Sequence, residues 1–99
     1  MIRFQRTMQF RRGSHAMKWA SELTDYVYTT HGGPRMALFR SRFGNISTIY
    51  WVGDFDNLAA LDAWQQAVGA DKGYRELVKK SFAFVIPGSV EDTVLEALP

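Results

Sequence analysis

The stretch RSRFGNISTIYWVGDF, residues 40–55, decides the fold of this chain of 99 residues. Two apolar runs flank Gly44 and Asn45, a pair that suits the positive φ angles of a tight two-residue turn. Apolar runs on either side of such a turn are typical of a β-hairpin. The sequence therefore predicts two antiparallel strands, over residues 35–43 and 46–55.

The register of this hairpin puts large apolar side chains on both faces of the sheet. The facing pairs are Phe43 with Ile46, Phe39 with Tyr50, and Leu38 with Trp51. A sheet with one face on helices and the other in water alternates apolar and polar residues instead. We therefore expect both faces to be covered, one of them by a second copy of the chain. The candidate dimer interface consists of Phe39, Tyr50 and Phe43.

A strand and a helix precede the hairpin. Residues 2–10 alternate apolar and polar side chains, which is the period of a β-strand. In residues 14–30 the apolar side chains recur at helical spacing instead, Ser14 is placed to cap the helix, and the run GGP that follows ends it. The first half of the chain therefore predicts the order strand, helix, hairpin.

A second helix, a shorter helical segment and a last strand follow the hairpin. Asp56 or Asn57 is placed to begin the second helix, and Asp71 restarts the helical pattern after a break. Residues 90–98 predict a final strand or extended arm. The order β-α-β-β-α-β is that of a ferredoxin-like α+β fold, in which two helices cover one face of a four-stranded antiparallel sheet.

Length, charge and cysteine content limit the function classes. Residues 1–99 are enough for a single domain, and the absence of cysteine excludes disulfides and thiolate metal sites. The formal net charge is +2, and the basic residues occur singly or in pairs interleaved with acids, so we expect no nucleic-acid partner. No apolar run approaches the roughly 18 residues of a membrane span, and no signal-peptide pattern follows the N-terminus. We expect a cytoplasmic protein without a membrane partner.

Arg6 is the most informative candidate for function. It interrupts the apolar row of the first strand, where a charge is unfavourable unless a partner, solvent or a ligand meets it. In one interpretation its head group reaches a carboxylate at the rim of the sheet, such as Glu22 or Asp25. In the other interpretation it contacts a ligand in a cleft.

Aromatic residues and a second arginine supply the other candidates. Arg40 falls on the same side of the hairpin as Trp51, and either joins Arg6 at a ligand or lies exposed. Four aromatic residues either line a pocket or form part of the core, namely Trp19, Tyr26, Trp51 and Trp64. The candidate ligand-binding residues are therefore Arg6, Arg40, Trp51, Trp64 and Tyr26.

The two histidines do not indicate a metal site. His31 lies at the end of the first predicted helix, where a positive ring interacts favourably with the helix dipole. His15 lies in the first turn of the same helix, and no Asp or Glu shares a ligand spacing with either histidine. We expect no metal and no cofactor.

The chain resembles the dimeric α+β barrel superfamily, with its NIPSNAP-like branch the most similar and its antibiotic-biosynthesis-monooxygenase branch more distant. The segments that carry the resemblance are RRG (residues 11–13), RFGNISTIYWVGDFDNLAALDAW (residues 42–64) and FVIPGSVEDTVLEAL (residues 84–98). The resemblance implies that two sheets close face to face into a barrel at a homodimer interface. It also implies a cleft between helices and sheet that holds a ligand.

The resemblance implies three alternatives for function. The first is a homodimer that binds a small apolar or aromatic molecule in the helix–sheet cleft, and the second is a cofactor-independent monooxygenase. The third is a structural or regulatory dimer without a ligand. Heme-degrading relatives depend on a histidine in the second-helix region, and DKGYRELVKK, residues 71–80, contains none. The resemblance therefore disfavours heme as a cofactor.

Overall fold

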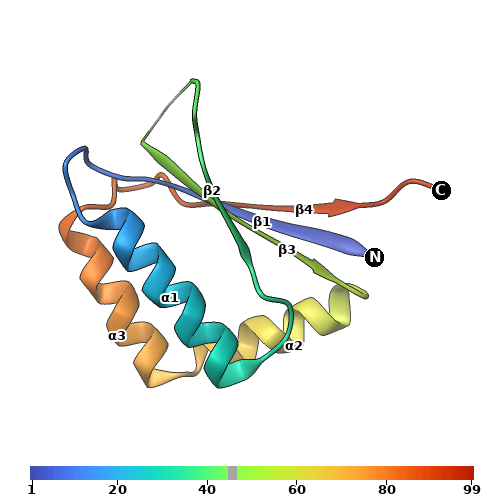
Figure 1. Ribbon diagram of the computed structural model, residues 1–99. Coiled ribbons are helices and arrows are strands. Elements are labelled where there is room, and N and C mark those ends of the chain that lie inside the picture. The colour runs from blue at the N-terminus through green and yellow to red at the C-terminus, as the bar shows by residue number, and fades with distance from the viewer. Residues whose placement is uncertain (45–46) are drawn as a thin grey trace.

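The computed structural model describes residues 1–44 and 47–99 as a four-stranded antiparallel sheet with helices against one face (Figure 1). The elements are β1 (Ile2–Gln9), α1 (Ala16–His31), β2 (Ala37–Arg40), β3 (Thr48–Phe55), α2 (Leu58–Gly69), α3 (Lys72–Lys80), the 3₁₀ turn η1 (Ser81–Ala83) and β4 (Glu91–Glu96). The strand order in the sheet is β2-β3-β1-β4. This is the predicted ferredoxin-like α+β fold.

The predicted hairpin register is confirmed where the structure describes it. Phe39 pairs with Tyr50, and Leu38 pairs with Trp51, in the antiparallel ladder between β2 and β3. The predicted turn and the pairing of Phe43 involve residues 45 and 46, which lie outside the described residues. The confirmed pairs are enough to set which side chains of the two strands share a face.

The first helix ends as predicted but begins differently. Gly32 follows its last residue with φ at 69°, and its backbone N–H donates to the carbonyl of Tyr28. Only glycine adopts such an angle without strain, so the chain turns here. The prediction that Ser14 caps the helix is wrong, because His15 stands at the cap position and its carbonyl accepts from Trp19 N–H.

Side-chain caps begin the other two helices. The Asn57 side chain accepts a hydrogen bond of 2.8 Å from Ala60 N–H, which starts α2. The Asp71 side chain accepts from the backbone N–H groups of Gly73 and Tyr74, which starts α3 as a separate helix. Both starts agree with the sequence prediction, because Asn and Asp side chains accept readily from backbone N–H groups two or three residues further along the chain.

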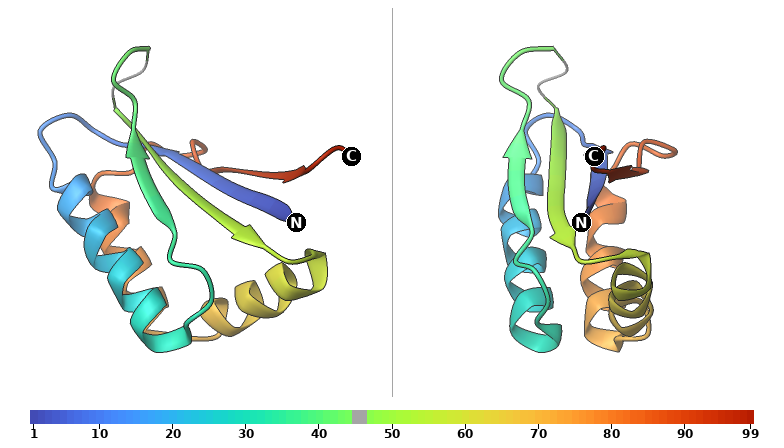
Figure 2. Two further views of the ribbon diagram at one scale, coloured as in Figure 1. Left: turned by 45° about the vertical axis from the view of Figure 1, so that its right-hand side comes forward. Right: turned by 90° about the vertical axis from the view of Figure 1, so that its right-hand side faces the viewer.

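The core lies between the helices and the face of the sheet that they cover. In the right-hand view of Figure 2, the sheet lies in front with its open face toward the viewer, and α1 and α3 lie behind it. The largest fully buried side chain is Ile49 on β3. The described helices all lack the combination of length and apolar character that crossing a bilayer needs.

The Ile49→Ala substitution is expected to lower the free energy of unfolding by about 2–5 kcal/mol, because it leaves a cavity among packed side chains. Ile49 is 1% exposed. Leu58→Ala is the matched control at a position that is 62% exposed, and should change this free energy by less than about 0.5 kcal/mol. Urea denaturation followed by circular dichroism measures both. Equal losses in the two variants would contradict the position of the core.

Candidate functional site

A cavity of ≈ 210 Å³ lies between the sheet and the helices α1 and α3. Most of its lining is apolar, and the residues come mainly from the sheet, from α1, and from α3 with the segment that follows it. Prominent lining residues are Arg6 and Trp51 from the sheet, Trp19 from α1, Tyr74 and Val78 from α3, and Phe82 from η1. A concave, largely apolar space with a few polar groups is the usual form of a small-molecule site.

Two tryptophans form one wall of the cavity. The rings of Trp19 and Trp51 pack edge to face, with centroids 6.1 Å apart. Each indole N–H already has an acceptor, since Trp51 donates to Thr24 Oγ1 at 3.0 Å and Trp19 donates to the Leu77 carbonyl at 2.7 Å. These bonds hold the rings in place and leave only their apolar surfaces for a ligand.

Arg6 lies at the edge of the cavity and pairs with Asp92 on β4. Its Nε is 2.7 Å from Asp92 Oδ1 and its Nη2 is 2.8 Å from Asp92 Oδ2, so the contact is two-pronged. The two residues are direct partners in the ladder between β1 and β4. The hydrogen bonds to Asp92 raise the pKa of Arg6, although desolvation by burial acts to lower it. Arg6 is therefore a permanent cation in the site.

The prediction that Arg6 reaches Glu22 or Asp25 is wrong. Asp25 pairs with Arg35, which follows α1 in the chain. The sequence could not identify Asp92 because the residues are 86 positions apart and meet only when β4 pairs with β1. The alternating pattern of the first strand identified Arg6 as an unusual charge, but no local pattern identified Asp92 as its partner.

Tyr74 joins Arg6 at the cavity. Arg6 Nη1 donates to the Tyr74 hydroxyl oxygen at 3.4 Å. Within the described part of the chain, the Tyr74 hydroxyl proton has no acceptor. A bound molecule with an acceptor atom can therefore receive hydrogen bonds from the Tyr74 O–H and from Arg6 Nη1. No local sequence pattern marks Tyr74 for this role, because its contact with Arg6 on β1 depends on the packing of α3.

The five candidate ligand-binding residues separate into three groups. Arg6 and Trp51 line the cavity. Trp64 lines a smaller adjacent cavity of ≈ 160 Å³, which Arg6 also lines. Tyr26 and Arg40 line neither space, since Tyr26 faces the start of α3 and Arg40 lies exposed at the end of β2.

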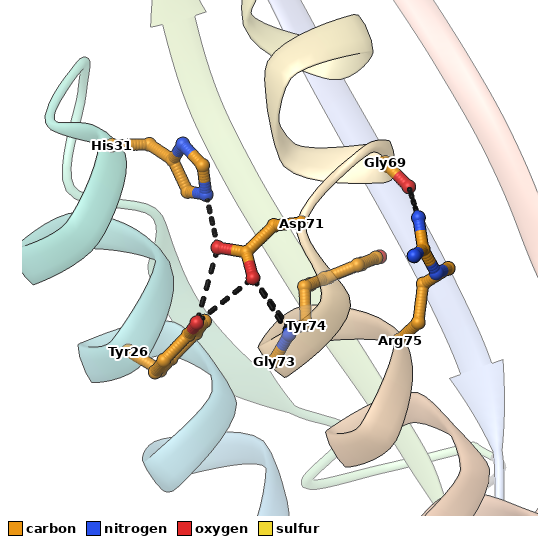
Figure 3. A network of polar contacts seen from close by, with 7 residues as sticks. All are labelled: Tyr26, His31, Gly69, Asp71, Gly73, Tyr74 and Arg75. Atoms are coloured by element: carbon orange, nitrogen blue, oxygen red, sulfur yellow. Dashed lines mark hydrogen bonds and ion pairs between the residues drawn. The ribbon is translucent and has the colours of Figure 1, made fainter.

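A second polar cluster joins α1 to the start of α3, on the side away from the open sheet face (Figure 3). The Asp71 carboxylate accepts from the Tyr26 hydroxyl at 2.9 Å and lies 2.6 Å from His31 Nε2. It also accepts from the backbone N–H groups of Gly73 and Tyr74. His31 was predicted to act on the dipole of its own helix, and the structure places its ring against α3 as well. The cluster is a clasp between two helices.

These contacts change the titration of the clasp. Desolvation acts to raise the pKa of Asp71, but the hydrogen bonds from Tyr26, His31 and the backbone outweigh it and hold the pKa below its usual value. The hydrogen bond to Asp71 is the main cause that raises the pKa of Tyr26. Within residues 1–44 and 47–99, no three His, Asp or Glu side chains gather to hold a metal ion.

The open face of the sheet carries a shallow hollow of mixed character. Phe39, Tyr50, Val52 and Leu95 line it together with charged residues that include Arg3, Arg35 and Asp54. Phe39 on the edge strand β2 is 56% exposed, which leaves a large aromatic surface in water. Phe43, the third candidate interface residue, does not line this hollow; it lies beyond the end of β2 and is 88% exposed. The structure therefore groups Phe39 with Tyr50 and places Phe43 apart.

Comparisons with known proteins concern the fold. No protein-family model matches the chain, and no curated protein matches it. A nipsnap family protein with unknown function from Agrobacterium tumefaciens has a TM-score of 0.77 at 18% identity, over 98% of this chain and 87% of that chain. An uncharacterized NIPSNAP domain protein from Burkholderia xenovorans has a TM-score of 0.78 at 14% identity, over 99% of this chain and 95% of that chain.

The oxygenase branch shows the same fold. SnoaB, a cofactor-independent oxygenase from Streptomyces nogalater, has a TM-score of 0.69 at 14% identity, over 99% of this chain and 93% of that chain. At such identities the similarity establishes the fold and leaves the activity open. The expected resemblance to NIPSNAP-like and antibiotic-biosynthesis-monooxygenase proteins is confirmed at the level of the fold.

Removal of the clasp should destabilise the protein in a pH-dependent way. Asp71→Ala removes the α3 cap and the partner of Tyr26 and His31, so we expect the melting temperature to fall by roughly 5 °C at neutral pH. A carboxylate with a depressed folded pKa contributes stability above its unfolded pKa, about 4, and loses it as pH falls through the folded value. The difference between wild type and Asp71→Ala should therefore shrink below about pH 4.

Asp62→Ala is the matched control, because Asp62 accepts a hydrogen bond from an exposed side chain of its own helix, Gln66, and from no other residue that the structure describes. Differential scanning calorimetry from acid to neutral pH measures both variants. A constant difference at all pH values would contradict the role of the Asp71 charge.

Proposed function

We propose that this chain forms a homodimer and binds a small apolar or aromatic molecule in the cavity between its helices and its sheet. The observation that carries the proposal is the apolar cavity with Arg6 and Tyr74 as hydrogen-bond donors at one side. A cavity of about 150 Å³ in another protein binds benzene. A volume of ≈ 210 Å³ suits a ligand of one or two rings.

The polar groups define the chemistry of this ligand further. The tryptophan N–H groups are occupied, so they offer apolar surface only. Arg6 keeps its charge but is largely neutralised by Asp92, which disfavours a ligand with a full negative charge and favours a neutral acceptor. The expected ligand is therefore an aromatic or apolar molecule with one carbonyl or hydroxyl oxygen directed at Tyr74 and Arg6.

Homodimer formation is supported by the open sheet face. Its apolar residues include Phe39, Tyr50, Val52 and Leu95, and the described helices all pack on the other face. A monomer would leave these side chains in water. A second sheet packed face to face buries them, and we expect a total buried area above about 1,200 Å².

The ligand prediction uses 1-naphthol and naphthalene as probes that share a ring system and differ by one hydroxyl. Arg6→Met should weaken the binding of 1-naphthol by roughly 1–3 kcal/mol, because a hydrogen bond from a charged donor is lost. It should leave naphthalene binding unchanged, because the apolar walls remain. Fluorescence titration measures both affinities.

Arg3→Met is the matched control for this substitution. Arg3 lies on the same strand and makes the same kind of two-pronged pair, with Asp54, but on the open face. The Arg3→Met variant should bind 1-naphthol and naphthalene with unchanged affinity.

Val78→Phe should fill the cavity and abolish the binding of both probes. Probe binding that survives Val78→Phe would place the site elsewhere.

The dimer prediction is tested at the open face. Phe39→Asp should give a monomer or an aggregate, because it places a charge where the second sheet is expected to pack. Leu58→Asp, at an exposed position of α2, is the matched control and should leave the oligomeric state unchanged. Light scattering at micromolar concentration measures the mass. A well-behaved wild-type monomer would refute the homodimer.

Cofactor-independent oxygenation is a second candidate, and the similarity in fold to SnoaB supports it. The reaction would place its substrate in the same cavity, and oxygen uptake on addition of 1-naphthol would favour it. The third alternative, a structural dimer without a ligand, predicts that neither probe binds and that native mass spectrometry finds no co-purified small molecule.

A further inference from the structure

The charges of this chain are strongly segregated. Residues 10–18, 40–44 and 79–90 contain seven of the twelve Lys and Arg residues and none of the ten Asp and Glu residues. The seven are Arg11, Arg12, Lys18, Arg40, Arg42, Lys79 and Lys80, and all are exposed. The rest of the chain is therefore net acidic. We call the surface formed by these three segments the basic end.

Backbone hydrogen bonds bring the three segments together. Phe10 N–H donates to the Ser47 carbonyl at 3.0 Å, which joins the end of β1 to the start of β3. Arg11 N–H donates to the Phe84 carbonyl at 2.8 Å, which joins it to the segment after η1. Figure 1 shows the connection from β1 to α1 beside the end of α3. The charges spread along the sequence thus meet at one end of the molecule.

A groove at the basic end concentrates the arginines. Arg12, Arg40 and Arg42 all line it, and no acidic residue of the described chain does. These three guanidinium groups make no ion pair with any described residue, whereas Arg3, Arg6 and Arg35 each have an aspartate partner. A cluster of unpaired cations repels itself in water, so a negatively charged surface is its natural complement.

Large apolar side chains project among these charges. Phe43 is 88% exposed and Met17 is 36% exposed, and both line the same groove. Phe82 is 68% exposed and lies two residues after Lys80. Exposed aromatic side chains set among Lys and Arg are the combination that binds the headgroup and acyl boundary of an anionic bilayer.

We propose that the basic end is a docking surface for an anionic lipid membrane. The exposed cations face the lipid headgroups, and Phe43 and Phe82 enter the boundary below them. A free phosphate compound would account for the arginines but not for the two exposed phenylalanines. The proposal replaces the expectation, drawn from the linear sequence, that basic residues are interleaved with acids and that the protein has no membrane partner.

Docking in this orientation brings the cavity to the membrane. Phe82 and Val90 are the strongly exposed members of the cavity lining, and both belong to the basic end. An apolar ligand dissolved in the bilayer would thus reach the cavity without crossing water. Delivery of a ligand from the bilayer to the cavity rests on the proposed function, whereas docking itself does not. Docking can therefore be tested without a cavity ligand.

Vesicle sedimentation of the full chain tests the docking. The vesicles consist either of phosphatidylcholine alone or of equal parts phosphatidylcholine and phosphatidylserine. We expect the protein to sediment with the mixed vesicles at low salt, and to be released at high salt because the attraction is screened. Arg12→Gln combined with Arg42→Gln should lower the partition coefficient about 30-fold, and Phe43→Ser about tenfold.

Matched controls come from the opposite, acidic part of the surface. Lys72→Gln combined with Arg75→Gln removes the same charge from the first turns of α3, and Leu58→Ser removes an exposed apolar side chain from α2. Both controls should sediment like wild type. Circular dichroism verifies that every variant is folded before its binding is compared.

Three kinds of result would overturn the proposal. One is a lack of selectivity, seen either as equal binding to the two kinds of vesicle or as equal losses in the control variants. Another is release from mixed vesicles by low concentrations of pyrophosphate, which would indicate a site for a soluble anion. The third is tight, salt-sensitive binding of single-stranded DNA without vesicle binding, which would make the basic end a nucleic-acid surface.

Discussion

The pairing of β1 with a neighbour on each side is the constraint on which the rest of the structure depends. As an inner strand, β1 must bury one row of side chains beneath the helices, and Arg6 falls in that row. The charge is tolerated because β4 brings Asp92 directly opposite it. The ion pair stands at the edge of the apolar cavity, so the same contact completes the sheet and forms the polar corner of the candidate site.

The helices are held over the sheet by two kinds of contact. Edge-to-face packing of Trp19 on Trp51 joins α1 to β3, and the indole hydrogen bond of Trp19 joins α1 to α3. The clasp around Asp71 joins the other end of α1 to the start of α3. Because both ends of α1 are fixed to α3, the space between helices and sheet keeps an open volume instead of collapsing.

Each of the three proposed interactions takes place at a different surface of the molecule. In these proposals the cavity would accept a small apolar molecule, the open sheet face a second subunit, and the basic end an anionic bilayer. Phe39 and Phe43 are only four residues apart, yet they belong to different surfaces: Phe39 lines the hollow on the open face, and Phe43 lines the groove at the basic end. The cavity and the basic end share Phe82 and Val90, so docking would bring the cavity to the bilayer, whereas the hollow on the open face shares no lining residue with either.

The sequence by itself determined the element order, the helix starts at Asn57 and Asp71, the glycine stop after α1 and the hairpin register, because each depends on residues close together in the chain. It also marked Arg6 as unusual. Only the tertiary structure decided that Asp92 is its partner, that Tyr74 joins it, and that basic residues from three segments meet at one end. Such contacts join residues distant in sequence, and strand order and helix packing, which no local pattern encodes, create them.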